Sequence, residues 1–527
     1  MAASTAKVAP MPAHDDSQGI LLSAAACARA DRHTMDTLGV PSLLLMERAA
    51  LAVSHEIRER FTEGRDVTVL CGPGNNGGDG LAVARQLHGW GIPARALLCT
   101  TRRNETVTEQ LHLARTLGVE ILAELPAEAA GNATIVVDAL LGTGARGAPR
   151  GAIETALRWL LRASGPRVAI DVPTGVDPDT GATPGIAARV DLTVTMQRSK
   201  PGLHITPGRD QAGVIVIADI GLVEGPDRDP GAQADASMRL VSPWAVAELT
   251  DGASAGHKGE RGHIGVLGGS RGTTGAAILA GVAAMRCGAG LVTITELEAG
   301  LGDVMISGRP ELMIAPVRDG VLGDLPLPRA DVLIVGPGLT RAQDRRQLAA
   351  LWSEDPRPAI WDASALDEIP IAAEGRALPP RIITPHPGEA RRLLGRLGAA
   401  AEQALDLRAD RREAARALAR LTGAIVVLKG AGTLIDDGTR LAIAVSGGPA
   451  LATAGSGDCL TGFIAALVGL GNGLFEAACA GVHLHGLAGE LAVSERPGAL
   501  ALDIAELAGA AKAAVPGHPR WPKRRLA

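Results

Sequence analysis

The chain has 527 residues, which is too long for one hydrophobic core and predicts two or three domains. Apolar residues make up 46% of it and charged residues 21%, as in ordinary soluble proteins. A formal charge of −5 argues against a dedicated nucleic-acid binder, and the absence of Tyr, with only 3 Phe and 6 Trp, requires aliphatic cores.

The cysteines and the apolar stretches exclude further classes. None of the 6 cysteines forms a C-x-x-C pair, so neither a zinc site nor a disulfide framework is predicted. Residues 1–19 lack the apolar region of a signal peptide. The apolar stretch 275–294 contains Arg286 and is typical of a core helix followed by a strand. We therefore expect a cytoplasmic protein that binds neither membranes nor nucleic acid.

The first half alternates short strands with helices. Residues 1–20 are expected to be disordered, and residues 21–61 predict two helices broken at 39–41. The predicted strands that follow are 66–70, 94–99, 134–141, 167–173, 192–196 and 213–220. β-Branched runs separated by helices indicate a parallel sheet covered on both faces. We predict an α/β domain at 21–223, Rossmann-like and doubly wound.

The second half repeats this pattern after a polar linker. Residues 224–240, "EGPDRDPGAQADASMRL", have no apolar period and predict the linker. A second α/β domain is expected at 241–512. Its predicted strands are 263–269, 291–296, 331–338, 359–364, 381–385 and 424–430. The basic, proline-rich residues 513–527 predict a frayed tail.

A glycine-rich turn follows the first predicted strand. Residues 71–80, "CGPGNNGGDG", precede a helical stretch, and such a turn favours an anion at the helix N-terminus. The turn differs from G-x-G-x-x-G, because asparagines and an acid stand where small residues are expected. Amide side chains can hydrogen-bond ribose or phosphate without repelling it.

Three later strand ends also carry polar or glycine-rich chemistry. "VDALLGTGARG" contains Asp138, "DVPTGVD" contains Asp171 and Thr174, and "RSKPGLH" supplies Lys200. Each residue taken singly is also typical of a cap or turn. Because ligands of a doubly wound sheet bind beyond the carboxyl ends of its strands, the four together predict one ligand site.

The motifs "GPGNNGGDG", "VDALLGTG" and "DVPTGVD", in this order, resemble the NAD(P)H-hydrate epimerase domain over about residues 21–223. The resemblance implies that the domain binds the hydrated coenzymes NADHX and NADPHX, with Asp171 as a catalytic residue. The implied substrate-binding residues are Asn75, Asn76, Gly77, Gly78, Asp79, Gly142, Thr143, Gly144, Ala145, Arg146, Gly147, Ala148 and Asp171. The implied ligands of a potassium ion are Asn76, Asp138 and Thr174.

The second half contains "TAGSGDCLTGFIAALVGL" at 453–470. The amides of 455–457, at the start of a helix, form an anion hole suited to a phosphoryl group in transfer. Asp458 is placed to take a proton from a substrate hydroxyl. "VLKGAGT" puts Lys429 and two glycines at a strand end, and "ITPHPGEARRL" places His386 and Glu389 before a helix.

Together with "GPGLT" at 336–340, these motifs resemble the ADP/ATP-dependent NAD(P)H-hydrate dehydratase domain, a ribokinase-like fold, over about 241–512. The resemblance implies phosphorylation of the C6 hydroxyl of the S-hydrate by ADP or ATP, with Mg2+ shielding the phosphates. The implied nucleotide-binding residues are Lys429, Gly430, Ala431, Gly432, Thr433 and Gly457. The implied hydrate-binding residues are Gly338, His386 and Asp458, with Asp458 also the catalytic base.

Five positions depart from the pattern expected of that family. Ser364 stands where a second aspartate is usual, and the others are Gly448, Ala450, Leu451 and Ala454. The run 455–458 is intact, so turnover is still expected.

We therefore expect a bifunctional repair enzyme, isomerase and lyase, that forms a homo-oligomer. Two alternatives stay open: a ribokinase-like vitamin or sugar kinase with a nucleotide-binding front domain, and a front half that is a non-catalytic module. The preference for ADP or ATP, and the chemical route of epimerisation, are open as well.

Overall fold

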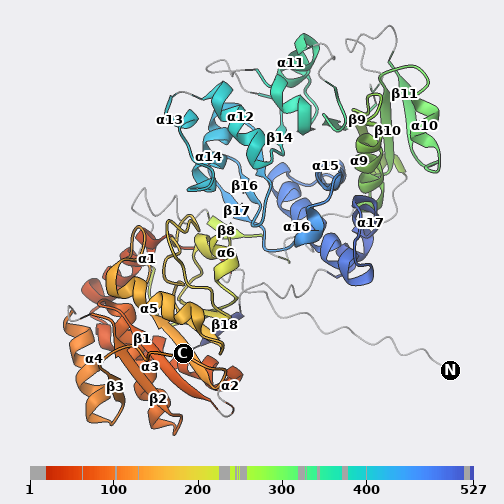
Figure 1. Ribbon diagram of the computed structural model, residues 1–527. Coiled ribbons are helices and arrows are strands. Elements are labelled where there is room, and N and C mark those ends of the chain that lie inside the picture. Colours follow the sequence, from red (N-terminus) through yellow and green to blue (C-terminus); the bar gives the residue numbers. More distant parts are fainter. Residues whose placement is uncertain are drawn as a thin grey trace, which may run out of the picture.

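The computed structural model describes residues 19–514 and 523–526. The exceptions within that span are 62, 64, 101–103, 129, 225–237, 242, 244–245, 247–248, 250–257, 318–326, 328, 341–344, 371–377 and 399. Two α/β domains are evident in Figure 1, and both have the predicted fold class. The predicted disordered segment 1–20 lies outside the described residues except at its last two positions.

The first domain contains an eight-stranded sheet in which every neighbouring pair is parallel. Its order is β18-β7-β6-β5-β4-β1-β2-β3. The strands are β1 (Asp66–Cys71), β2 (Ala94–Leu98), β3 (Glu120–Leu122), β4 (Thr134–Ala139), β5 (Arg167–Ile170), β6 (Leu192–Met196), β7 (Val214–Asp219) and β18 (Lys523–Leu526). The strand order reverses between β1 and β4, so a crevice is expected beyond their carboxyl ends.

Helices cover both faces of this sheet, as predicted. They are α1 (Ala24–Arg32), the π-helix η2 (His33–Thr37), α2 (Ser42–Phe61), α3 (Asn75–Gly89), α4 (Glu105–Thr116) and α5 (Gly151–Arg162), with short turns η3 (Pro201–Leu203) and α6 (Gly208–Gln211). Alternate residues of β1 face opposite ways: Val69 packs with α2, α3 and α4, whereas Leu70 packs with α5. The predicted break between the first helices is confirmed at Gly39, which has φ 73°.

The second domain is built on a ten-stranded sheet of order β11-β10-β9-β12-β13-β14-β15-β16-β17-β8. The strands are β8 (Met238–Leu240), β9 (His263–Leu267), β10 (Leu291–Glu296), β11 (Met313–Pro316), β12 (Val332–Val335), β13 (Ala359–Trp361), β14 (Arg381–Ile383), β15 (Ile425–Leu428), β16 (Leu434–Asp436) and β17 (Leu441–Ile443). Strands β15, β16 and β17 pair antiparallel, and the other pairs are parallel. Here the order reverses between β9 and β12.

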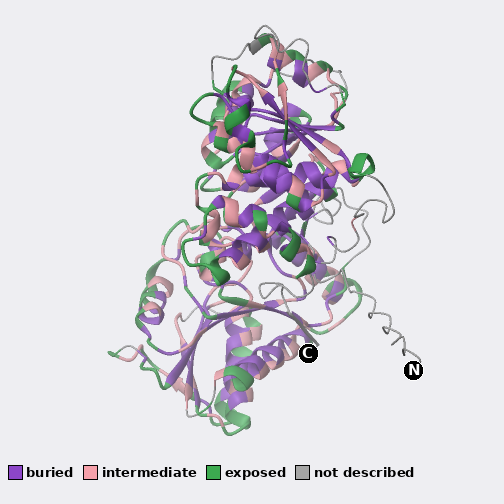
Figure 2. Ribbon diagram, turned by 90° about the vertical axis from the view of Figure 1, so that its right-hand side faces the viewer, coloured by how far each residue is buried: buried purple, intermediate pink, exposed green. Residues whose placement is uncertain are grey.

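This sheet is also buried between helices, as the purple strands of Figure 2 show. One face packs on α9 (Thr274–Cys287), α15 (Ser456–Gly469), α16 (Leu474–Glu495), α17 (Ala501–Glu506) and α18 (Ala508–Ala513). The other packs on α11 (Arg345–Glu354), α12 (Pro387–Leu397) and α14 (Arg411–Thr422). The shorter helices are η4 (Lys258–Arg261), α10 (Gly302–Ile306), η7 (Ala363–Glu368), α13 (Ala400–Gln403) and η8 (Pro449–Leu451).

Two predictions about the linking segments are wrong in part. The end of the predicted linker, Met238–Leu240, forms β8 at the edge of the second sheet. The end of the predicted frayed tail, Lys523–Leu526, forms β18, which extends the first sheet beside β7 and brings the C-terminus back to the first domain (Figure 1). Both strands add to sheet edges through backbone hydrogen bonds, which need no apolar pattern in the sequence.

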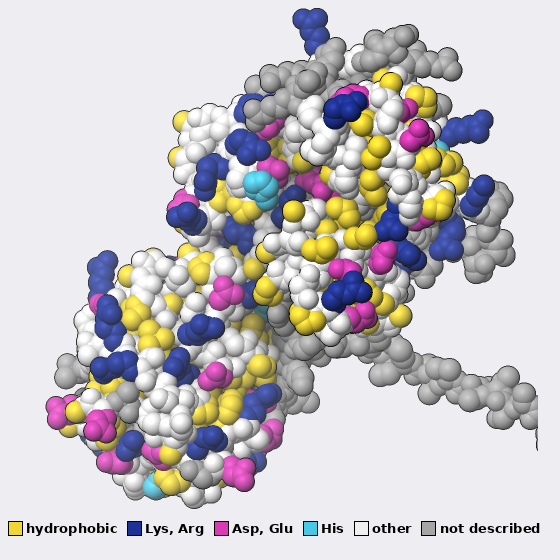
Figure 3. Space-filling model, turned by 45° about the vertical axis from the view of Figure 1, so that its right-hand side comes forward, with side chains coloured by type: hydrophobic (Ala, Val, Ile, Leu, Met, Phe, Trp, Pro, Cys, Tyr) yellow, Lys and Arg dark blue, Asp and Glu magenta, His cyan; other side chains and the backbone are white. Residues whose placement is uncertain are grey.

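The surface carries both basic and acidic side chains, as the nearly balanced composition predicts. Basic and acidic side chains are interspersed over the face in Figure 3. Among the described residues, no helix is long and apolar enough to cross a membrane.

Candidate active sites

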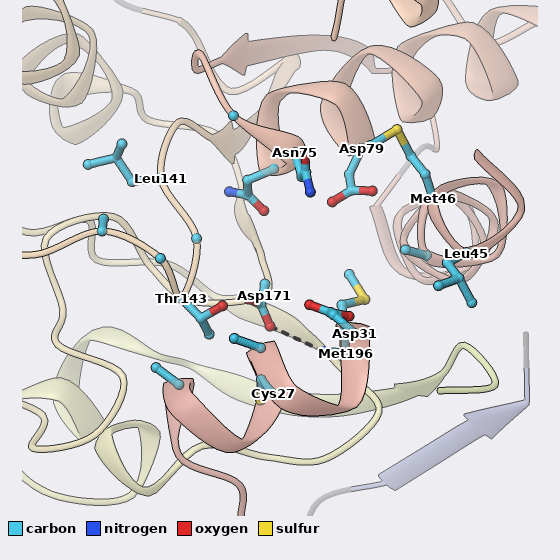
Figure 4. A pocket seen from close by; sticks show the side chains of 18 of the residues that line it. Cys27, Asp31, Leu45, Met46, Asn75, Asp79, Leu141, Thr143, Asp171 and Met196 are labelled. Atoms are coloured by element: carbon cyan, nitrogen blue, oxygen red, sulfur yellow. Dashed lines mark hydrogen bonds between the residues drawn. The ribbon is translucent and has the colours of Figure 1, made fainter. Parts of the chain in front are cut away.

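A cavity of about 640 Å³ lies beyond the carboxyl ends of β1 and β4, where the first sheet reverses (Figure 4). The loops after these two strands approach closely: a Cβ on Gly72 would lie 1.7 Å from the carbonyl oxygen of Leu140. Helices α1 and α2 close the cavity on the side away from these loops. Most of the residues predicted for the first site are therefore brought together.

The glycine-rich turn begins α3 and supplies one wall. Asn75, Asn76 and Asp79 line the cavity. Gly77 and Gly78 do not line it; they allow close packing, because a Cβ on Gly77 would lie 2.0 Å from the Gly72 oxygen and one on Gly78 would lie 2.7 Å from Met46. These two glycines thus set the position of the helix.

The loop after β4 supplies a second wall. Residues 142–146 line the cavity, whereas Gly147 and Ala148 do not. The guanidinium of Arg146 donates to the carbonyl oxygens of Thr143 and Ala145, which braces the loop. The turn Gly142–Ala145 is closed by a backbone hydrogen bond of 3.1 Å.

Asp171 and Lys200 form a buried ion pair beside the cavity. The Lys200 ammonium donates to Asp171 Oδ1 at 2.6 Å, to Thr195 Oγ1 at 2.9 Å and to the Met196 carbonyl at 2.9 Å. Burial alone would raise the pKa of Asp171, but the Lys200 charge and hydrogen bond hold it below its usual range. Every recorded contact of this carboxylate among the described residues uses Oδ1, which leaves Oδ2 open to a ligand.

The backbone of Asp171 is also unusual. Its φ is 68°, a left-handed conformation that costs a non-glycine residue free energy. The carboxylate is anchored by Lys200 and Thr195, so the strain is compensated by the contacts that direct it toward the cavity.

Two of the residues predicted as potassium ligands, Asp138 and Thr174, contact each other behind the first cavity. Asp138 is fully buried and accepts hydrogen bonds from the Thr174 hydroxyl at 2.7 Å and the Thr174 amide at 2.8 Å. Burial raises the pKa of Asp138 to about 6, against these hydrogen bonds. Asn76 lines the cavity beside the loop after β4, and its side-chain nitrogen is buried without a partner among the described residues. Asp138 and Thr174 thus join the end of β4 to the turn after β5.

Several residues that line this cavity were not predicted from the sequence. Asp31 and Cys27 of α1 line it, as do Met46 of α2 and Met196. Lys200 was expected at a strand end but not as the partner of Asp171. No glycine turn or motif marks Asp31; its only signal is an acid within the amphipathic segment 21–38.

The second site lies at the carboxyl ends of β13, β14 and β15. The Lys429 ammonium donates to Asp362 Oδ1 at 2.7 Å and lies 3.9 Å from Glu389 Oε2. The Thr384 hydroxyl donates to the same Asp362 oxygen at 2.8 Å. Burial lowers the pKa of Lys429, but Asp362 and Glu389 more than offset this and raise it. Asp362 was not predicted, although it is an acid at a predicted strand end.

Helix α15 points its N-terminus at this cluster. Gly455 is its cap at φ 90°, and a Cβ on Gly457 would lie 3.2 Å from Lys429 Nζ. The first amides of a helix have no acceptor within it, so those of α15 are available to bind an anion beside Lys429. Burial, followed by repulsion from Asp362, raises the pKa of Asp458 to about 6, against the pull of Lys429.

The predicted nucleotide loop follows β15. Gly430 and Gly432 have φ 145° and 68°, and the Thr433 hydroxyl donates to the Gly430 carbonyl at 2.8 Å. The buried Arg411 guanidinium donates to the carbonyls of 428, 429 and 431, so this arginine, which was not predicted, holds the loop from behind.

His386 and Gly338 occupy structural positions as well. His386 caps α12: its Nδ1 accepts from the amides of Gly388 at 3.0 Å and Glu389 at 3.4 Å. Gly338, at φ 68°, packs on the start of α9, where the Thr273 hydroxyl donates to its carbonyl. Ser364, one of the departures, donates to the Leu339 carbonyl at 2.5 Å and so fastens this turn to the end of β13.

The described residues contain no group of three or more His, Cys, Asp or Glu side chains that could hold a metal ion. Mg2+ is commonly bound through one or two carboxylates together with water and substrate phosphates, so its binding does not require such a group.

Comparison with known proteins relates each domain to a family. A family model described as NAD(P)H-hydrate dehydratase matches residues 264–508, and one described as YjeF-related protein N-terminus matches residues 42–202. The chain is 35% identical to the bifunctional NAD(P)H-hydrate repair enzyme of Escherichia coli K12, over 90% of each chain. It is 36% identical to the enzyme of that name in Moorella thermoacetica, over 90% of this chain and 93% of that one.

Among solved structures, it is similar to an ADP/ATP-dependent NAD(P)H-hydrate dehydratase from Bacillus subtilis co-crystallised with ATP and Mg2+. That likeness has 28% identity and a TM-score of 0.45, and covers 52% of this chain and 98% of that one.

Proposed function

The chain belongs to the family of bifunctional NAD(P)H-hydrate repair enzymes, and we propose that it epimerises the R and S hydrates of NADH and NADPH and dehydrates the S epimer at the expense of ADP or ATP. The observation that carries the proposal is that one chain contains both domains, each with a polar cluster beyond the carboxyl ends of its parallel strands: the cavity beyond β1 and β4, and the Lys429 cluster beyond β13, β14 and β15. An epimerase beside the dehydratase makes both epimers recoverable.

The first cavity suits the hydrated nicotinamide coenzyme. Asn75 and the backbone of 142–146 present neutral donors and acceptors for ribose and phosphate. Asp171, the proposed catalytic residue, offers Oδ2 to the nicotinamide half of the ligand. Because Lys200 keeps it ionised, Asp171 stabilises positive charge that develops on the ring.

A potassium ion fits the oxygens of Asn76, Asp138 and Thr174. Asp138 is fully buried, and its recorded partners within the described residues are neutral, so a cation would compensate a buried charge. An amide, a carboxylate and a hydroxyl oxygen are suitable ligands for a hard cation. The ion would hold the loops after β4 and β5 together at the base of the cavity.

The second site suits phosphoryl transfer. Lys429, the loop 430–433 and the amide of Gly457 bind the nucleotide phosphates, while His386 and Gly338 border the hydrate. Asp458 takes the proton of the C6 hydroxyl as that oxygen attacks the terminal phosphorus and ADP or AMP leaves. The C6–O bond then breaks with loss of phosphate, and a proton leaves C5 to restore the dihydronicotinamide. When bound, Mg2+ neutralises phosphate charge.

The test is recovery of reduced coenzyme from a mixture of both NADHX epimers, with Mg2+, K+ and either ADP or ATP. We expect absorbance of the reduced nicotinamide to return for the whole mixture. Recovery of only the S fraction would remove the epimerase from the proposal, and a stable phosphorylated product would favour the kinase alternative. Replacing K+ by Na+ tests the proposed ion, and sedimentation tests the predicted homo-oligomer.

A further inference from the structure

The first cavity contains three carboxyl groups in different environments. Asp171 is held as an anion by Lys200 at 2.6 Å. Asp31 and Asp79 have neither a recorded hydrogen bond nor an ion pair with any residue that the structure describes. Both residues line the cavity, so their carboxyl groups are available to a ligand bound there.

These two carboxyl groups enter the cavity from different helices. Asp79 is in the second turn of α3, behind the glycine-rich start of that helix, and Asp31 is near the end of α1. In Figure 4 their side chains are directed into the space between the two helices, with Asp171 beside Asp31. A flat ring bound in this space therefore has one carboxyl group toward each side.

The surrounding charges favour one proton shared between the carboxyl groups of Asp31 and Asp79. Burial, followed by repulsion from Asp171, raises the pKa of Asp31, against Lys200 and Arg32. Burial and repulsion from Asp171, Asp31 and Glu47 raise that of Asp79 well above its usual value. Cys27 stays a neutral thiol, because burial raises its pKa to about 11. Carboxyl groups that repel one another in a common cavity tend to hold one proton between them.

We propose that Asp31 and Asp79 are the catalytic acid and base of epimerisation, acting on opposite faces of the hydrated ring. The inference deepens the proposed epimerase activity and rests on it. One carboxyl group donates a proton to the C6 hydroxyl as the C6–O bond breaks, and water leaves while the N1 lone pair forms an N1=C6 iminium ion. A water on the other face then attacks C6, the electron pair of N1=C6 returns to N1, and the opposite carboxylate takes the proton.

Asp171 has a separate part in this scheme. Its pairing with Lys200 keeps it from donating a proton, but its anion lies beside the ring on which positive charge appears. The reaction reverses with the roles of Asp31 and Asp79 exchanged, as an epimerase that works in both directions requires.

The test uses Asp31→Asn and Asp79→Asn in the full chain, with interconversion of separated R and S hydrates followed by chromatography. Each variant is expected to lower kcat of epimerisation by about 10²- to 10⁴-fold, the usual contribution of a general acid or base. KM should change much less, because the amide keeps the shape of the side chain. The bell-shaped pH dependence expected of the wild type should lose one limb in each variant.

Asp36→Asn is the matched control, since this exposed acid of η2 lies in the same segment and does not line the cavity. It should epimerise as the wild type does. Dehydration of the pure S-hydrate by each variant reports on folding independently of the first site. Asp31→Glu, which keeps the carboxyl group, should recover part of the rate.

The outcomes separate the two proposals. If the wild-type chain does not interconvert the epimers, the proposed epimerase activity fails. If it does, and Asp31→Asn keeps the wild-type rate and pH profile, the acid–base pair is wrong. A loss shared equally by Asp31→Glu and Asp36→Asn would also overturn it, because it would show a structural effect of the segment.

Discussion

Asp458 and Asp171 show how neighbouring charges give one residue type opposite properties. Both are partly buried acids: Asp171 follows β5, and Asp458 lies in the first turn of α15. Asp171 contacts Lys200 directly, and the pKa of its carboxyl group falls. At Asp458 the nearest cation, Lys429, is already paired with Asp362, so burial and repulsion dominate and the pKa rises to about 6. A raised value suits a base that must also release its proton near neutral pH.

At the residue scale we predict that Asp458→Ala lowers kcat of dehydration by at least about 10²-fold, because the C6 hydroxyl loses its base. Epimerisation, measured by chromatography, should be unchanged in the same variant. Release of phosphate at the wild-type rate in the presence of hydrate would contradict the role.

The pH dependence provides a second readout of Asp458. The base works ionised, so wild-type dehydration should fall as pH drops through about 6. Asp362→Asn removes one negative neighbour and frees Lys429, so it should shift this limb to lower pH. An unshifted limb would mean that another group titrates.

At the scale of elements, α3 and α15 begin in a similar way in the two domains. Each begins with glycines immediately beyond the sheet and points its N-terminus at a site. The glycines of α3 allow close packing. A Cβ on Gly77 would lie 2.0 Å from a backbone oxygen of Gly72, which cannot move without shifting β1.

We therefore expect Gly77→Ala to displace the first turn of α3, to lower the free energy of unfolding by about 1–3 kcal/mol and to abolish epimerisation. The matched control is Gly89→Ala, at the other end of α3, where an added Cβ meets no atom within 4 Å. This control should keep activity. Thermal denaturation and the epimer assay measure both variants, and equal behaviour of the two would contradict the packing argument.

At the scale of the whole molecule, residues of the first domain contact backbone atoms of the second. The Arg209 guanidinium donates to the carbonyls of Val445 at 3.1 Å and Gly447 at 3.3 Å. Gly432, in the nucleotide loop, packs on the carbonyl of His204, four residues after Lys200. The chain segment that supplies the epimerase lysine therefore borders the predicted nucleotide loop of the dehydratase.

Gly432→Ala should disturb this contact, because its Cβ would lie 2.2 Å from the His204 oxygen. We expect a raised KM for ADP and ATP in the dehydration assay, with a lowered midpoint of thermal unfolding. Gly438→Ala is the control: Gly438 also has a positive φ, 91°, and an added Cβ meets no atom within 4 Å. Both variants carry backbone strain of about 1–2 kcal/mol, so only the excess in Gly432→Ala measures the domain contact.

The two α/β domains, most of their strands and the motifs at the strand ends could be predicted from the amino-acid sequence. These features are local: a β-branched run, a glycine turn and a helix cap are each set by adjacent residues. For the same reason it missed β8 and β18, whose pairing depends on a distant partner strand. The predicted roles of the remaining site residues stay predictions.

Which charged side chains contact one another became evident from the folded chain alone. Asp31 lines the first cavity, Lys200 forms an ion pair with Asp171, and Lys429 forms its ion pair with Asp362 rather than with Asp458. The two ion pairs join residues 29 and 67 positions apart, and the pKa of each group depends on distances that no local pattern contains. Local sequence patterns thus predicted where the sites lie, whereas the charge of each acid depends on neighbours that only the fold brings close to it.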